Sequence, residues 1–333
     1  MRRTIVTGVR GAATASVVVL ALAACGGNLG TAGGAGGDFP DGPVTVVVGQ
    51  DPGGSTDLIG RAVAELASDE LGVALPVENR PGANGAVASQ EVADSEPDGQ
   101  TVLVLNASLI AITSLVSPDD AVSLDDFTII TGISRDDYVL VTHPESGLAT
   151  LGDIAASGQT LDFATTGVGT GSQLSQQLLF HQMGVQGNDV PFDGGSPALT
   201  AVLGKQVDVA SIQLGEAYPQ IEAGELVPLV VFSPERNEYL PDVPTAVEEG
   251  YDVPVAQYRA LAVPAGTPDA TVEALRSAFE AAFADQGYQD FNEQALLTPH
   301  EVSGEQVVEE WTAAKEKYES IVEEYDIDLG AAG

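Results

Sequence analysis

Residues 44–60 read VTVVVGQDPGGSTDLIG, and they predict a strand, a glycine turn and the start of a helix. Val44 to Val48 show no polar alternation, which is typical of a parallel strand that is buried on both faces. Apolar residues then recur with a helical period from Ile59 to Ala67, cap-type residues precede them, and Gly72 suits the helix end. Free backbone N–H groups and the positive end of the helix dipole meet at such a turn. The stretch therefore predicts an anion site, with a turn that serves packing alone as the alternative.

The first 40 residues have the features of export and anchoring. Three arginines precede a short apolar run, which is typical of a secretory signal peptide and too short to cross a bilayer as a permanent helix. The run ends in Leu-Ala-Ala-Cys, which resembles the bacterial lipoprotein signal and implies that Cys25 becomes the lipid-bearing first residue of the mature chain. We therefore expect a lipoprotein signal over 1–24 and a glycine-rich tether over 25–40.

The charge balance excludes some classes of partner. The chain has 49 acidic and 12 basic residues, a formal charge of -37, and removal of the three signal arginines leaves -40. Nucleic acid is excluded as a partner because phosphate binding needs a basic surface. Self-repulsion on this scale is tolerable where salt screens it, so the composition favours a high-salt habitat, with an ordinary acidic surface as the alternative. A single cysteine allows no internal disulfide.

Strand-like and helix-like runs alternate after the tether, which indicates mainly parallel sheets in two α/β lobes. The predicted strands are 75–78, 101–105, 161–166, 207–213, 227–232 and 258–263, with two strand-like halves in 128–142 that cross between the lobes. The predicted helices are 86–93, 173–183, 196–204, 269–286 and 304–323. We expect residues 41–136 and 258–333 to form lobe 1 and residues 137–257 to form lobe 2.

A second glycine loop follows the strand at 161–166 and repeats the design of the first. Its Gly-Val-Gly-Thr-Gly-Ser sequence lacks the third glycine and the later acid of a dinucleotide fingerprint, so no cofactor is expected. The histidines at positions 143, 181 and 300 have no metal-ligand or triad spacing, and no Gly-x-Ser-x-Gly elbow occurs. We therefore expect neither an enzyme nor a metal site.

Seven short segments recur together in one family of receptors. They are GGSTD at 53–57, ENRPGANG at 78–85, PDG at 97–99, GVGT at 167–170, GGSPAL at 194–199, PDVPT at 241–245 and PAGTP at 264–268. With them the chain resembles the Bug-type extracytoplasmic solute receptors of tripartite tricarboxylate transporters, in a lipoprotein form. The resemblance implies a two-lobed type II periplasmic-binding-protein fold that closes on a small carboxylate. It also implies delivery to the permease subunits of a secondary transporter; a receptor of an ATP-driven importer, a ligand sensor and a structural surface lipoprotein are the alternatives.

The resemblance places the ligand between the two glycine loops. The expected ligand-binding residues are Gln50, Gly53, Gly54, Ser55, Thr56, Asp57, Asn106, Ser108, Thr166, Gly167, Gly169, Thr170, Ser172, Asp193 and Gly194. Neither loop carries a lysine or arginine, so recognition is expected to rest on backbone N–H groups, hydroxyls and helix dipoles. Asp57 either orders its loop or touches the ligand. We expect an extracytoplasmic monomer that is lipid-anchored to the cell membrane.

Two departures from the family pattern bear on the ligand. Gly49-Gln50-Asp51 stands where the family commonly has Pro-Phe and a small residue, so an amide and a carboxylate replace an aromatic wall. Gln173 stands where a histidine is frequent in the family. The sequence therefore predicts the class of ligand but not its identity.

Overall fold

The computed structural model describes residues 39–117, 122–327 and 329–330. The predicted signal, Cys25 and most of the predicted tether lie outside the described residues, so these predictions stay untested. Within the described ranges, no helix is long and apolar enough to cross a membrane.

The strands form a sheet in the order β2-β1-β3-β9-β4-β7-β5-β6, with β8 also paired to β4. The strands are β1 (Thr45–Val48), β2 (Val77–Asn79), β3 (Thr101–Asn106), β4 (Phe127–Thr142), β5 (Leu161–Thr165), β6 (Gly187–Pro191), β7 (Val209–Gln213), β8 (Val227–Val231) and β9 (Ala256–Pro264). The β1–β2, β1–β3, β5–β6 and β5–β7 pairs are parallel. The pairs that include β4 or β9 are antiparallel.

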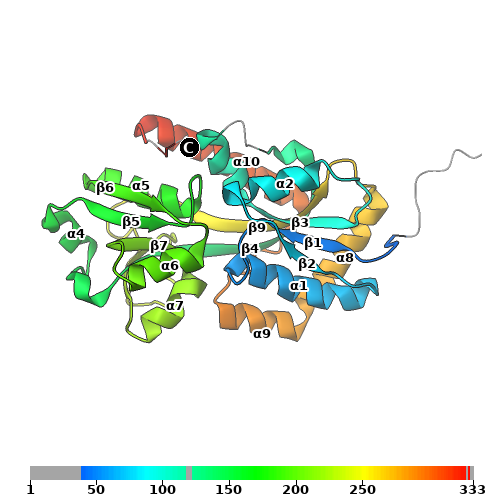
Figure 1. The fold of residues 1–333 in the computed structure, drawn as a ribbon, viewed down its shortest axis with the longest axis horizontal. Helices are drawn as coiled ribbons and strands as arrows, with labels where there is room; N and C mark the ends of the chain where they lie inside the picture. The colour runs from blue at the N-terminus through cyan, green and yellow to red at the C-terminus, as the bar shows by residue number, and fades with distance from the viewer. Residues whose placement is uncertain (1–38, 118–121, 328, 331–333) are drawn as a thin grey trace, which may run out of the picture. The chain divides into compact units, whose positions relative to one another are not determined.

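The strand β4 joins the two lobes that the sequence predicted. Its first part pairs with β9 from Phe127 to Asp137, and its last part pairs with β7 from Tyr138 to Thr142. The two strand-like halves expected there form one continuous strand of 16 residues. In Figure 1, β4 and β9 run through the middle of the sheet, with β1 to β3 on one side and β5 to β7 on the other. Any cleft between the lobes must therefore have these two strands as its floor.

Helices cover both faces of the sheet in each lobe (Figure 1). They are α1 (Ser55–Leu71), α2 (Ala86–Ala93), α3 (Ser114–Val116), α4 (Leu151–Ser157), α5 (Gly171–Met183), α6 (Gly195–Leu203), α7 (Leu214–Glu222), α8 (Asp269–Ala284), α9 (Gln286–Ala295) and α10 (Gly304–Glu324). The sequence analysis predicted α1, α2, α5, α6, α8 and α10 and missed α3, α4, α7 and α9. It also missed the edge strand β6.

The core explains why the strands lack polar alternation. Val46 and Val48 pack with α1 and α8 on one face of the first-lobe sheet, whereas Val47 packs with α2 and α10 on the other face. In the second lobe, Leu140 and its neighbour Val141 also belong to different clusters on opposite faces. Each of these side chains is 1% exposed or less. Because successive strand residues point to opposite faces, a sheet with helices on both sides needs apolar residues at every position.

The last helix, α10, packs against both lobes. Trp311, which is 1% exposed, lies in a cluster with β3 and β9 of the first lobe. Tyr318, two turns later, packs in the main cluster of the second lobe, and its hydroxyl donates to the Pro254 carbonyl at 3.2 Å. The C-terminal half of α10 therefore contacts the second lobe, although the sequence analysis placed all of 258–333 in the first.

Candidate functional site

A cavity of about 360 Å³ lies where the strands of the two lobes end. Residues at the carboxyl ends of β1, β3, β5 and β7 line it, and β4 and β9 contribute its floor. Carboxyl ends of parallel strands are the usual ligand side of an α/β sheet. Ten predicted residues line the cavity: Gln50, Gly54, Ser55, Thr56, Asn106, Ser108, Thr166, Thr170, Asp193 and Gly194. The other five, Gly53, Asp57, Gly167, Gly169 and Ser172, do not line it.

Asp57 has a structural role in the first glycine loop. Its carboxylate is 2% exposed and accepts hydrogen bonds from the Gly53 N–H at 2.9 Å and from Asn79 Nδ2 at 2.8 Å. It also pairs with Arg61 at 2.8 Å. Burial raises the pKa of Asp57, but the hydrogen bonds from Arg61, Gly53 and Asn79 outweigh burial and hold that pKa below its ordinary value. Of the two roles left open for Asp57, the geometry supports loop ordering.

Gly169 joins the two lobes and is no free anion donor. Its N–H donates to Oε1 of Gln173 at 2.8 Å, so the backbone donor expected to bind the ligand is already used. Its carbonyl accepts from Thr113 Oγ1 at 3.0 Å and from Asn84 Nδ2 at 3.3 Å. Asn84 belongs to the first lobe, whereas the segment of Thr113 packs through Ile112 in the main cluster of the second lobe. Gly169 therefore contributes a contact between the lobes beside the cavity.

Ser172 and Gly167 also lie outside the cavity lining. Ser172 is fully buried, and its hydroxyl donates to the Ser211 carbonyl at 2.6 Å while accepting from the Thr166 N–H at 3.1 Å. Gly167 lines a neighbouring hollow instead, and its carbonyl accepts from Thr170 Oγ1 at 2.7 Å. These hydrogen bonds fix the backbone conformation of the second glycine loop.

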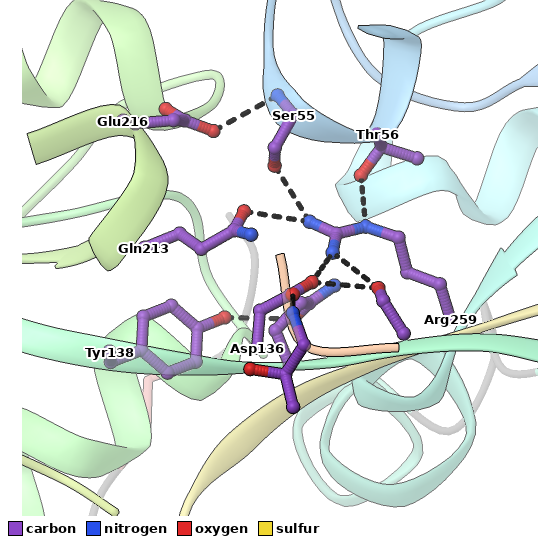
Figure 2. A network of polar contacts seen from close by, with 10 residues as sticks. Ser55, Thr56, Asp136, Tyr138, Gln213, Glu216 and Arg259 are labelled. Atoms are coloured by element: carbon purple, nitrogen blue, oxygen red, sulfur yellow. Dashed lines mark hydrogen bonds and ion pairs between the residues drawn. The ribbon is translucent and has the colours of Figure 1, made fainter. Parts of the chain in front are cut away.

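A buried arginine lies at the floor of the cavity, which the sequence analysis did not anticipate. Arg259 of β9 is 3% exposed and forms an ion pair with Asp136 of β4, which is 1% exposed. It also donates to Ser134 Oγ at 3.2 Å, and Ser134 is its register partner across the two strands. A buried charge is tolerated only when it is paired and hydrogen-bonded, and here both conditions hold. Figure 2 shows the guanidinium enclosed by its partners.

Arg259 donates its remaining hydrogen bonds to side chains of both lobes. Its Nε donates to Thr56 Oγ1 at 2.9 Å, and its Nη2 donates to Ser55 Oγ at 2.7 Å and to Gln213 Oε1 at 2.9 Å (Figure 2). A guanidinium has five N–H donors, and all five thus have protein acceptors. Arg259 is therefore a positioning residue with no donor left for a ligand.

The hydroxyls that Arg259 holds are suited to an anion. Because Ser55 Oγ and Thr56 Oγ1 accept from the guanidinium, each O–H hydrogen is free to donate, and no acceptor for it is found in the part of the chain that the structure describes. The N–H groups of the first helical turn, including that of Thr56, have no acceptor within α1. Gln213 Nε2 is buried and lacks a partner among the described residues. Several donors therefore converge on one cavity, which suits a carboxylate.

Two more side chains of the second lobe, those of Tyr138 and Glu216, also line the cavity. Tyr138 is 4% exposed and donates its hydroxyl to Gln257 Oε1 at 2.8 Å; burial raises the pKa of this phenol, so it stays protonated. Glu216, in the first turn of α7, accepts from the Ser55 N–H at 3.1 Å across the cavity. Neither residue stands in a sequence motif, and only the fold brings them to the glycine loop at 53–57.

The chain is similar to one family of receptors and to several of their solved structures. Residues 59–327 match the family described as tripartite tricarboxylate transporter family receptor. Protein BugT of Bordetella pertussis is 32% identical over 282 residues, which cover 80% of this chain and 85% of BugT. The structure of the periplasmic binding protein BugD has a TM-score of 0.81 at 26% identity and covers 87% of this chain and 99% of BugD. MatC from Rhodopseudomonas palustris with bound malate has a TM-score of 0.80 at 29% identity over 85% of this chain and all of MatC.

Proposed function

Because the chain belongs to the tripartite tricarboxylate transporter receptor family of solute-binding proteins, we propose that it captures a small carboxylate outside the cytoplasm and delivers it to the permease subunits of such a transporter. The related MatC structure contains malate, which supports a carboxylate ligand in this chain. The observation that carries the proposal is the convergence of the Ser55 and Thr56 hydroxyls and the Gln213 amide on one cavity.

In this mechanism the carboxylate binds at the N-terminus of α1. Hydrogen bonds to Ser55, Thr56 and Gln213 replace those that the carboxylate loses with water. Arg259 contributes by fixing and polarising both hydroxyls, so its charge acts on the ligand without direct contact.

Ligand binding also favours the closed arrangement of the lobes. Ser55 contacts Glu216 and Asn84 contacts Gly169 between the lobes, so closure brings donors from both lobes together. A ligand that bonds to both lobes stabilises the state in which they are close, and the permease is expected to recognise that state.

Calorimetric titration of the full-length protein with mono-, di- and tricarboxylates tests the proposed function. The variant Thr56→Val removes one hydroxyl at nearly constant volume and is expected to weaken carboxylate binding by about tenfold, since a hydrogen bond to a charged group contributes roughly 1.5–3 kcal/mol. Thr200→Val is the matched control, because Thr200 is exposed on α6 and its hydroxyl only donates to the Ser196 carbonyl. Absence of binding to every carboxylate, or equal loss in both variants, would contradict the proposal.

We also propose that the protein is held at the cell membrane by a lipid on Cys25. Changing Cys25 to Ser is expected to release the exported protein from membranes without altering its fold, because serine lacks the thiol that the lipid would modify. Fractionation of cells that express either form measures the result. A Cys25→Ser protein that still sediments with membranes after export would refute the lipid anchor.

A further inference from the structure

We infer that Glu216 makes this receptor selective for carboxylates that carry a neighbouring ammonium group. The inference rests on the proposed function, because it assumes that the cavity holds a carboxylate. It concerns the groups of the ligand that lie beside that carboxylate, and it starts from polar atoms of the cavity that the protein leaves unpaired.

Glu216 has one carboxylate oxygen in use and one available. Oε1 accepts from the Ser55 N–H at 3.1 Å, which fixes the carboxylate beside the N-terminus of α1 (Figure 2). Oε2 is buried and has no hydrogen-bond partner among the described residues. A side chain at Gly195 would fill the place of this oxygen, since a Cβ there would lie 1.9 Å from Oε2. A buried carboxylate oxygen without a partner is costly, and a ligand that donates to it removes that cost.

Gln213 supplies the complementary donor three residues earlier. Its Oε1 accepts from Arg259, so its Nε2 is identified as the free donor, and this residue is 4% exposed. Gln213 ends β7 and Glu216 lies in the first turn of α7, so one short junction offers an amide donor and a carboxylate acceptor to the same cavity. A ligand with a carboxylate and an ammonium on neighbouring atoms satisfies both groups.

The charge of the cavity favours the same class of ligand. Its charged lining residues are Asp51, Asp193, Glu216 and Arg259, and the charge of Arg259 is balanced by Asp136 behind it. A ligand with carboxylates alone would add negative charge to an excess of negative charge. An ammonium group offsets part of that repulsion and offers three donors, whereas a hydroxyl offers one donor and no charge. A further buried acceptor of the lining, Gln50 Oε1, also lacks a partner within the described ranges.

Three ligands with the same four-carbon skeleton test the inference. Succinate has two carboxylates, malate adds a hydroxyl and aspartate adds an ammonium group. Titration calorimetry of the full-length protein is expected to show aspartate binding at least tenfold more tightly than succinate, and more tightly than malate. Glutarate and glutamate repeat the comparison with one more methylene. Equal affinity for succinate and aspartate would overturn the inference, and so would malate binding as tightly as aspartate.

The variant Glu216→Gln links this preference to its residue. It keeps an oxygen for the Ser55 N–H but replaces the free acceptor and its charge with a neutral amide, so the ratio of aspartate to succinate affinity is expected to fall at least tenfold. Glu222→Gln removes the same charge from an exposed position on the same helix and should leave the ratio unchanged. An unchanged ratio in Glu216→Gln would overturn the inference even if the variant binds weakly. Failure of the wild-type protein to bind any of the five ligands would overturn this inference, whereas the proposed function fails only if no carboxylate of the wider titration binds.

Discussion

Asp57 shows how a single carboxylate can organise an anion site without belonging to it. Its oxygens accept from the Gly53 N–H, Asn79 and Arg61, so it fixes the turn that leads into α1. The residue stands in the motif GGSTD, and from sequence alone it was equally suited to capping and to ligand contact. Only the position of Asn79, which β2 brings beside the loop, distinguishes the two roles.

Replacing Asp57 by Asn should destabilise the protein in a pH-dependent way. The pKa of Asp57 is lower in the folded protein than its ordinary value, so its charge stabilises the fold above the unfolded pKa of about 3.9. That contribution is lost as pH falls through the lowered pKa. We expect Asp57→Asn to cost about 1–3 kcal/mol near pH 7, and the difference from wild type to shrink below about pH 4. Urea unfolding of both proteins from pH 7 to pH 3 measures it; a difference independent of pH would contradict this account.

Arg259 was missed for a reason that applies to buried charges in general. Its contacts lie 46 residues away at Gln213, 123 at Asp136 and 204 at Ser55. No local pattern joins such positions, because they meet only after β4 and β9 have paired and α1 has docked. The signal available in the sequence was one arginine within an otherwise apolar strand, YRALAV, in a chain with few basic residues. A cation in such a strand must be partnered, and that reasoning could have placed it at a polar site.

At the scale of elements, the two strand–turn–helix units were predictable because their signals are local. β1, α1 and the left-handed Gly72 that ends α1 all agree with periodicity and capping residues. α9 was missed because Asp285, in an extended conformation, separates it from α8, and the predicted helix 269–286 ran through this break. α7 was missed because it is short and contains Pro219. Sequence patterns thus identified the loops of the site but not the β7–α7 junction that faces them.

The second glycine loop should be sensitive to a side chain at Gly169. Its φ of +72° favours glycine, and a Cβ there would lie 2.9 Å from the Thr113 Cα, which is backbone of the segment that follows β3. Gly184 ends α5, the helix that follows this loop. Its φ is +67°, and no atom lies within 4 Å of its Cβ position. We expect Gly184→Ala to cost about 1 kcal/mol for the backbone alone, and Gly169→Ala about 1–3 kcal/mol more because of the close approach.

Chemical unfolding of both glycine variants checks this prediction. The control isolates the cost of the backbone conformation, so the difference between the variants measures the close approach of Gly169 to Thr113. Equal destabilisation would contradict this account, because the backbone near Thr113 would then accommodate a side chain at no cost. Weaker ligand binding in Gly169→Ala alone would further connect this contact with closure, since the Gly169 N–H itself is bonded to Gln173.

At the scale of the whole molecule, the fold follows from covering one continuous sheet on both faces in each lobe. Four apolar clusters account for the helices on either side of the sheet in the two lobes, and α10 contributes to one cluster in each lobe. The alternation of strands and helices was sufficient to predict two α/β lobes. It could not predict that β4 would be one continuous strand, since a sequence run shows apolar residues but not which strand pairs with which.

The net charge should make stability depend on salt. The chain carries a formal charge of -37, and its ion pairs are mostly exposed ones, such as those of Arg80 and Arg236, which contribute little. Repulsion among the remaining carboxylates reaches about 30 Å at 0.01 M salt but only about 3 Å at 1 M salt. We therefore expect the melting temperature at pH 7 to fall when sodium chloride is lowered from molar to millimolar concentrations. The same change near pH 4, where many carboxylates are protonated, should have a much smaller effect. Thermal unfolding at both pH values measures the salt dependence of the melting temperature. A salt effect equally large at pH 4 would mean that salt acts through hydration rather than through charge screening. No salt effect at pH 7 would favour an ordinary acidic surface over adaptation to high salt.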